Sequence, residues 1–184
     1  MTDHRPGTMK AWLYSSASGG LEKAIKLNTD APQPRQPLSK NDILVEVISM
    51  SLNPADTKIP EMGIVSMAII GTPASPGLDF CGRVTATGTA VDSFRIGELV
   101  FGKLDKPTKF GTLGQYVIAS YEGCATLPEG INPDHAAAIG TAALTAYQCI
   151  VPNVKAGNKV FINGGSGGTG TWGIQIAKTL GCHV

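Results

Sequence analysis

The sequence predicts a mixed fold class: a mostly antiparallel, barrel-like β domain, followed by the first βα(β) unit of a parallel α/β domain. Two observations lead to this prediction. Short alternating or β-branched segments, separated by Pro, Gly and Asn, extend from Met9 to about Ile131, as is typical of antiparallel barrels. From Asn132 onward apolar residues recur at helical spacing, and a glycine-rich loop lies between a short apolar strand and a helix. We therefore divide the chain into a tail (1–8), a β domain (9–131) and an incomplete α/β domain (132–184).

The composition narrows the classes of partner and location. The chain has 184 residues, of which 42% are hydrophobic and 16% charged, which is typical of a soluble, loop-rich protein. A formal net charge of +1 is too small to attract a phosphate backbone or anionic lipids, so we expect neither nucleic acid nor membrane as a partner. The polar first residues do not resemble a secretion signal, and we expect a cytoplasmic protein.

The cysteines do not indicate a metal site. Cys81, Cys124, Cys149 and Cys182 are widely spaced, without the paired spacing that lets one loop bind a metal from two sides. The three histidines are equally dispersed. We expect four reduced thiols and no bound metal.

The β domain contains five segments that we expect to be strands, because their residues alternate or are β-branched and turn formers separate them. The apolar segment Glu61–Ile70 is instead expected to be a short helix. The expected strands are "KAWLYS", "DILVEVISMSLN", "GRVTATG", "ELVFGKL" and "GQYVIAS".

The α/β part begins with a helix start signal. Asn132 can accept hydrogen bonds from free N–H groups, Pro133 suits the first helical position, and Asp134 complements the helix dipole. We expect this helix to continue to about Cys149. A strand "KVFIN", a glycine loop, a second helix ending at Gly181 and the start of a parallel strand at "CHV" should follow.

The glycine loop is the strongest functional motif. The residues Gly165, Ser166, Gly167, Gly168, Thr169 and Gly170 satisfy G-x-G-x-x-G between a strand and a helix, and we expect all six to bind a dinucleotide. Gly165 would permit the turn, Gly167 would let the backbone approach a pyrophosphate, and Gly170 would let the helix lie close to the sheet. The residue that reads the adenosine ribose should lie about 20 residues further on, at or beyond the last residue given.

With this loop, several motifs occur in one order along the chain. They are "NPADTK", "PGLDFCGRVTATG", "FRIGELVFG", "LPEGINPDHAAAIGTAALTAYQ" and "VFINGGSGGTGTWGIQIAK". On these motifs the sequence resembles the medium-chain dehydrogenase/reductase superfamily, in particular its zinc-free quinone oxidoreductase and trans-enoyl reductase branch. The resemblance implies a GroES-like β-barrel domain followed by a Rossmann domain, within which this chain is truncated.

The resemblance also implies roles for individual residues. Lys58, in the "NP-x-D-x-K" position, and Thr141, in the "GT" of the later helix, are the implied catalytic residues. Asn53 and Thr145 are implied cofactor contacts, with NADPH as the implied cofactor and NADH left open.

Zinc-dependent members of the superfamily carry a cysteine in the first motif region and a His-Glu pair in the second. In this chain Ala55 and Asp56 stand in the first region, and Leu78 and Asp79 in the second. Neither pair supplies a thiolate or an imidazole, so the resemblance implies a reaction without metal.

Three functional hypotheses remain open. The first is an NAD(P)H-dependent oxidoreductase that transfers hydride to an α,β-unsaturated carbonyl or a quinone as part of a longer enzyme. The second is a catalytically inactive GroES-like binding module, and the third an interaction protein whose open half-sheet recruits another chain. A homodimer or a missing C-terminal half could supply the rest of the sheet. Lys58 could also be a surface lysine, Thr141 could bond only within its helix, and Asp79 could be scaffold.

Overall fold

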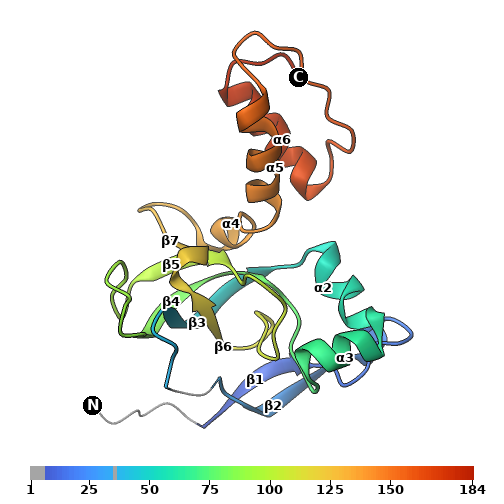
Figure 1. Cartoon of the computed structure of the whole chain (residues 1–184), viewed down its shortest axis with the longest axis vertical. Helices are drawn as coiled ribbons and strands as arrows, with labels where there is room; N and C mark the ends of the chain where they lie inside the picture. Colours follow the sequence, from blue (N-terminus) through green and yellow to red (C-terminus); the bar gives the residue numbers. More distant parts are fainter. Residues whose placement is uncertain (1–6, 35–36) are drawn as a thin grey trace.

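The computed structural model of this chain describes residues 7–34 and 37–184. The β domain occupies the lower part of Figure 1, and helices α5 and α6 project from it. The strands are β1 (Thr8–Leu13), β2 (Lys26–Pro32), β3 (Asp42–Ser51), β4 (Asp79–Thr87), β5 (Leu99–Lys103), β6 (Tyr116–Ser120) and β7 (Cys124–Thr126). The helices are α1 (Leu21–Ala24), α2 (Pro54–Lys58), α3 (Ile64–Ile70), α4 (Pro133–Ala137), α5 (Ala142–Ile150) and α6 (Gly168–Thr179), with 3₁₀ turns at η1 (Pro60–Met62), η2 (Tyr121–Gly123) and η3 (Val151–Asn153).

All named strands pair antiparallel, in a two-stranded sheet β1-β2 and a five-stranded sheet in the order β6-β3-β4-β5-β7. Strands β3, β4, β5 and β6 all contribute to a core built from aliphatic and aromatic side chains. A Cβ at Gly82 would lie 2.2 Å from the carbonyl oxygen of Glu46, so only glycine allows the two strands to approach this closely. The five expected strands are present with shifted bounds, and β2 and β7 were not predicted.

The expected barrel is not closed by a continuous ladder. The two sheets meet at one isolated bridge, Ala11 to Gly114, with hydrogen bonds on either side of it. The segment between β5 and β6 contains Pro107, Gly111 and Gly114, and these residues interrupt strand pairing. The prediction of an antiparallel β domain is therefore confirmed. Within the described part of the chain the two sheets do not form a closed barrel, and the bridge between Ala11 and Gly114 is where they pair.

The single helix expected from Asn132 to Cys149 is wrong, because the structure contains two helices there. Asn132 caps α4 through its side-chain oxygen, which accepts from the N–H of Asp134 at 2.8 Å. Helix α4 packs on β3 and β4, and the chain then turns at Gly140 before α5 begins. The interruption follows from the contacts of Thr141 with Asp79, described below.

The expected strand "KVFIN" forms only one parallel bridge, Lys159 to His183, instead of a ladder. Helix α6 is present as expected, with Gly173 and Ala177 buried on the face that meets α5, and Gly181 follows it at φ +78°. No helix among the described residues is both long and apolar enough to cross a membrane.

Candidate functional site

A cavity of about 610 Å³ lies where the β domain meets α5 and α6. In Figure 1 the beginning of α2 faces the helical part across this junction. The segment after β3 lines one wall, α5 a second, and the glycine loop with the start of α6 a third. Of the ten site residues expected from the sequence, five line it: Asn53, Gly167, Gly168, Thr169 and Gly170.

The loop at the end of "KVFIN" turns one residue earlier than expected. Gly164, at φ +74°, occupies the left-handed conformation, and Gly165 does not. Gly165 is nevertheless a central residue of the turn, which the hydrogen bond from the N–H of Gly167 to the oxygen of Gly164 closes at 3.0 Å, and its Cβ position lies 3.1 Å from the Ile174 side chain. The run of glycines offered several candidates for the turn, and spacing alone could not distinguish them.

Gly170 has the packing role expected of it. A Cβ at this position would lie 2.2 Å from the carbonyl oxygen of Gly164 and 2.8 Å from Cα of Gly165. Helix α6 can therefore begin directly against the loop. At Gly167 the nearest atom to a Cβ is the Gly164 oxygen at 3.4 Å, so the space beside this backbone is open toward the cavity.

Helix α6 is 12 residues long and begins at Gly168. Its first N–H groups have no partners within the helix, and the helix dipole adds partial positive charge at the same end. No acidic residue lies in the first turn. The open backbone at Gly167 and the start of α6 therefore fit the pyrophosphate of a dinucleotide.

The carboxylate of Asp79 joins the β domain to the start of α5. Its side chain is 0% exposed. Thr141 donates to it twice, from Oγ1 to Oδ1 at 2.7 Å and from the backbone N–H to Oδ2 at 2.9 Å. Asn53 donates from Nδ2 to Oδ2 at 2.9 Å. Ser51 Oγ lies 3.4 Å from Oδ2 but donates at 3.0 Å to the carbonyl oxygen of Ala137. A Cβ at Gly140 would lie 2.7 Å from Oδ1, so this glycine gives the carboxylate room.

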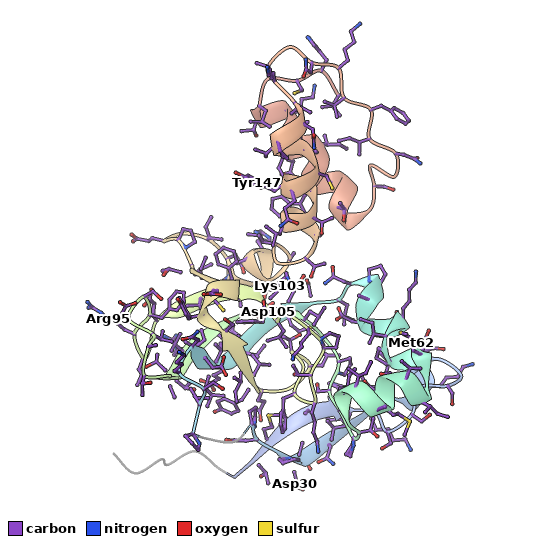
Figure 2. All side chains as sticks on the ribbon, in the orientation of Figure 1. Asp30, Met62, Arg95, Lys103, Asp105 and Tyr147 are labelled. Atoms are coloured by element: carbon purple, nitrogen blue, oxygen red, sulfur yellow. The ribbon has the colours of Figure 1, made fainter. Side chains whose placement is uncertain are left out.

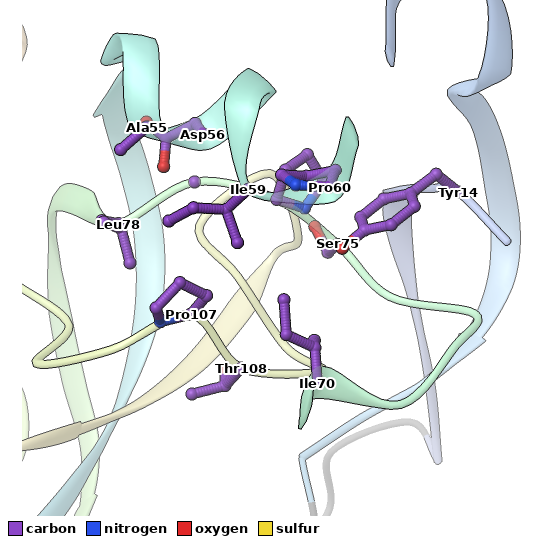
Figure 3. A pocket seen from close by; sticks show the side chains of 12 residues that line it. Tyr14, Ala55, Asp56, Ile59, Pro60, Ile70, Ser75, Leu78, Pro107 and Thr108 are labelled. Atoms are coloured by element: carbon purple, nitrogen blue, oxygen red, sulfur yellow. The ribbon is translucent and has the colours of Figure 1, made fainter. Parts of the chain in front are cut away.

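A second buried carboxylate, that of Asp56, accepts a hydrogen bond from the backbone of Asn53. Asp56 is 4% exposed, and its Oδ2 accepts from the backbone N–H of Asn53 at 2.7 Å. Burial raises the pKa of Asp56, and the nearby charge of Asp79 acts in the same direction, against the hydrogen bond from Asn53. Figure 3 shows the cause, because Asp56 enters a small pocket alongside the apolar side chains of Ile59 and Leu78.

The remaining expected residues do not line the cavity. Lys58 is exposed at the last position of α2, and Ser166 is exposed in the loop. Thr145 donates from Oγ1 to the carbonyl oxygen of Thr141 at 2.7 Å, one helical turn back. Thr141 is half-buried and bonded to Asp79. The next residue in the chain, Ala142, lines the cavity. Tyr147 is 55% exposed on α5, above the β domain in Figure 2.

The described residues contain no group of three or more His, Cys, Asp or Glu side chains that could hold a metal ion. Ala55 and Asp56 lie in the first motif region, and neither is a thiolate. Both oxygens of Asp79 already accept from N–H and O–H donors. This donor set does not fit zinc, which prefers thiolate and imidazole ligands.

The central position of Asp79 was missed from the sequence, where it was interpreted as possible scaffold. The available signal was a charged residue within "PGLDFCG", an otherwise uncharged segment that begins a core strand. A charge in that position needs buried partners. Those partners lie 26 and 62 residues away in the chain, so spacing could not identify them.

Comparison with known proteins supports the same arrangement. The sequence model of the alcohol dehydrogenase GroES-like domain matches residues 39–129. Trans-enoyl reductase pgmF of Aspergillus terreus is 49% identical over 188 residues, covering 97% of this chain and 53% of that protein. The quinone oxidoreductase of Sus scrofa is 36% identical, covering 90% of this chain and 49% of that protein.

Among solved structures, the quinone oxidoreductase from Coxiella burnetii superposes with a TM-score of 0.80 at 33% identity, covering 95% of this chain and 54% of that one. The chain thus spans about half the length of the relatives it matches. It matches them across both the β domain and the glycine loop. The chain belongs to the medium-chain dehydrogenase/reductase superfamily, as a GroES-like domain followed by part of a Rossmann-like domain.

Proposed function

We propose that this chain forms the substrate-side domain and the phosphate-binding loop of an NADPH-dependent reductase that acts on an α,β-unsaturated carbonyl or a quinone, within a longer enzyme. The observation that carries the proposal is the shared cavity, which places the segment of Asn53 opposite the glycine loop and the start of α6. A dinucleotide bound by its pyrophosphate at that loop would extend along the cavity toward Asn53.

The bound nicotinamide cofactor would supply the hydride, and the residues of this chain would stabilise the resulting charge. Hydride transfer to the β-carbon of an enone moves negative charge to the carbonyl oxygen, and a proton must then be delivered. Lys58, at the end of the helix that Asn53 begins, is the proposed cation beside that oxygen. Thr141 and Thr145 lie at the start of α5, where we propose that they contact the reacting end of the cofactor.

We further propose that the reaction needs no zinc. In support of this, the positions that carry zinc ligands in other members hold Ala55, Asp56, Leu78 and Asp79, which supply neither thiolate nor imidazole. The carboxylate of Asp79 is also engaged by hydrogen-bond donors at both oxygens. The preference for NADPH over NADH rests on the resemblance to the enoyl reductase branch. Competition titration of the two nucleotides would decide it.

The test of the proposed function compares Lys58→Ala with the parent in the polypeptide as its cell produces it. We expect kcat with an enone or quinone acceptor to fall about a hundredfold, because the variant lacks the cation beside the developing oxyanion. The Kd for NADPH, measured by fluorescence titration, should change by less than about twofold, because Lys58 does not line the cavity.

Lys23→Ala provides the matched control, because Lys23 is also an exposed lysine in the last turn of a short helix. It should leave both constants unchanged. Equal kcat in Lys58→Ala and the parent would show Lys58 to be a surface lysine. If the parent does not bind NADPH, the reductase proposal itself is wrong.

One observation favours a second candidate, an interaction module. Phe161 is 91% exposed and, with Val160 and Val184, lines an open apolar surface beside the short parallel bridge. Large exposed apolar patches mark binding surfaces. A well-behaved protein that forms discrete complexes through this surface but does not bind NADPH would support the module over the reductase.

A further inference from the structure

The environment of Asp79 consists entirely of donors. Its two oxygens receive the hydroxyl hydrogen and the amide hydrogen of Thr141 and an amide hydrogen of Asn53. Ser51 Oγ lies 3.4 Å from Oδ2, and its hydrogen has a shorter bond to the carbonyl oxygen of Ala137 at 3.0 Å. An ionised carboxylate can only accept, so Thr141 and Asn53 must direct their hydrogens toward it. At 0% exposure, no water could replace any of these partners without opening the junction.

Because Thr141 and Asn53 donate hydrogens to Asp79, those hydrogens are not available to a ligand. A threonine hydroxyl has one hydrogen, and that of Thr141 is directed to Asp79 at 2.7 Å. The remaining capacity of Thr141 Oγ1 is therefore to accept. Asn53 has its amide nitrogen on Asp79, which turns its amide oxygen away from that carboxylate. Thr141 Oγ1 thus offers an acceptor, whereas the Asn53 amide oxygen already accepts from the backbone N–H of Asp56 in a capping box.

We propose that Asp79 is a positioning residue that sets the hydrogen-bond polarity of this end of the cavity, so that Thr141 accepts from a donor group of the nicotinamide nucleoside instead of donating to the substrate's carbonyl oxygen. The inference rests on the proposed function and refines it. The groups of the nicotinamide nucleoside that can donate a hydrogen bond to Thr141 are the carboxamide N–H₂ and the ribose hydroxyls. Stabilisation of the carbonyl oxygen is left to Lys58.

The variant Asp79→Asn isolates polarity from shape, because the amide is nearly isosteric with the carboxylate. Two N–H donors, from Thr141 and Asn53, meet at Oδ2, so the amide oxygen of the variant must occupy that position. Its N–H₂ then lies where Oδ1 was and donates to Thr141 Oγ1. The bond between residues 79 and 141 is kept but its direction reverses, and the hydrogen of the Thr141 hydroxyl becomes available to another acceptor.

The experiment is a double-mutant cycle of Asp79→Asn and Thr141→Val in the polypeptide as its cell produces it, followed by titration calorimetry. The probes are NADPH and adenosine 2′,5′-bisphosphate, which lacks the nicotinamide nucleoside. We expect each single variant to weaken NADPH binding about tenfold, as the loss of one good hydrogen bond would. Affinity for the bisphosphate should change by less than about twofold in both. In the Thr141→Val background, Asp79→Asn should cause no further loss, because it acts through the hydroxyl that is already absent.

Two controls separate this effect from a general loss of structure. Thr141→Ser keeps the hydroxyl and should retain the affinity of the parent for NADPH. Thr85→Val removes another half-buried hydroxyl from β4, one that donates to the carbonyl oxygen of Leu44 at 3.1 Å, and should leave both affinities unchanged.

The outcomes are distinct. Selective loss of NADPH affinity with a non-additive cycle supports the inference. Equal weakening of both probes, an additive cycle, or unchanged NADPH affinity in Asp79→Asn overturns it while leaving the proposed reductase intact. A parent that binds neither probe overturns both.

Discussion

The β domain and the segment from Asn132 onward stabilise themselves in different ways. The largest fully buried side chains all lie before Asn132, and they include Phe80, Ile43 and Val45. After Asn132 the buried apolar residues are alanines and Cys182, while Phe161 is 91% exposed. The first region has a core of large side chains. In the second, α4 packs on the β domain, and α5 and α6 approach each other closely through small residues.

The candidate phosphate loop is positioned by contacts among its own residues. The position of the loop follows from local requirements: a left-handed Gly164, and a Gly170 that leaves no room for a side chain. The junction follows from one buried carboxylate, Asp79. Changes in the core and changes at the loop should therefore have separable effects on stability and on binding.

The largest expected effect is on the free energy of unfolding, when one phenylalanine in the β domain and one after Asn132 are each replaced by alanine. Phe80→Ala should lower the free energy of unfolding by about 3–5 kcal/mol, because it leaves a cavity at the centre of the β core. Phe161→Ala removes an equally large side chain that is almost fully exposed, and should change stability by less than about 0.5 kcal/mol. Urea denaturation of both variants measures the contrast. Similar losses in the two would show that Phe161 is buried in the protein as produced.

A second, smaller effect separates packing from binding within the loop. A Cβ at Gly170 would overlap backbone atoms that cannot move aside, so we expect Gly170→Ala to cost about 1–3 kcal/mol. The gain in helix propensity, about 1 kcal/mol, does not offset this overlap.

Gly167→Ala should leave stability and circular dichroism unchanged, because the nearest atom to its Cβ lies at 3.4 Å. It should nevertheless abolish NADPH binding, because the added methyl group fills space that the pyrophosphate needs. Undiminished NADPH binding in Gly167→Ala would place the phosphates elsewhere.

Much of this arrangement was predictable because its causes are local. The strand segments, the Asn132 cap and the helix after the glycine loop each depend on residues a few positions apart. The GroES-like and Rossmann-like assignments depend on motifs in a fixed order, and the relatives confirm them. The expected division at 131/132 stays a prediction, and α4 just beyond it packs on the β domain.

The errors have long-range causes. The break between α4 and α5 depends on Asp79, which is 62 residues from Thr141 in sequence and hydrogen-bonded to it in the fold. The helical periodicity on both sides of Gly140 gave no sign of it. Barrel closure likewise depends on pairing between β1 and the segment at Gly114, about a hundred residues later. Local spacing carries no information about such partners.

The smallest predicted effect concerns the second carboxylate at the junction. Because burial raises the pKa of Asp56 above its ordinary value of 3.8, the folded protein holds this proton more tightly than the unfolded chain does. The contribution of Asp56 to the free energy of unfolding is therefore largest at low pH, and it is lost as the pH rises through the folded-state pKa. Asp56→Asn removes this titration while its amide oxygen can still accept from the N–H of Asn53.

We expect the variant to gain stability relative to the parent over the pH interval that begins at about 3.8 and ends at the folded-state pKa of Asp56, with the gain increasing across it and constant above it. Urea unfolding of both proteins across that interval measures the difference. The matched control is Asp30→Asn, because Asp30 is exposed on β2 (Figure 2), and its stability difference from the parent should not vary in this way. A constant difference between Asp56→Asn and the parent at all pH values would mean that Asp56 titrates alike in the folded and unfolded chains. The apolar pocket around it would then not be as dry as its lining suggests.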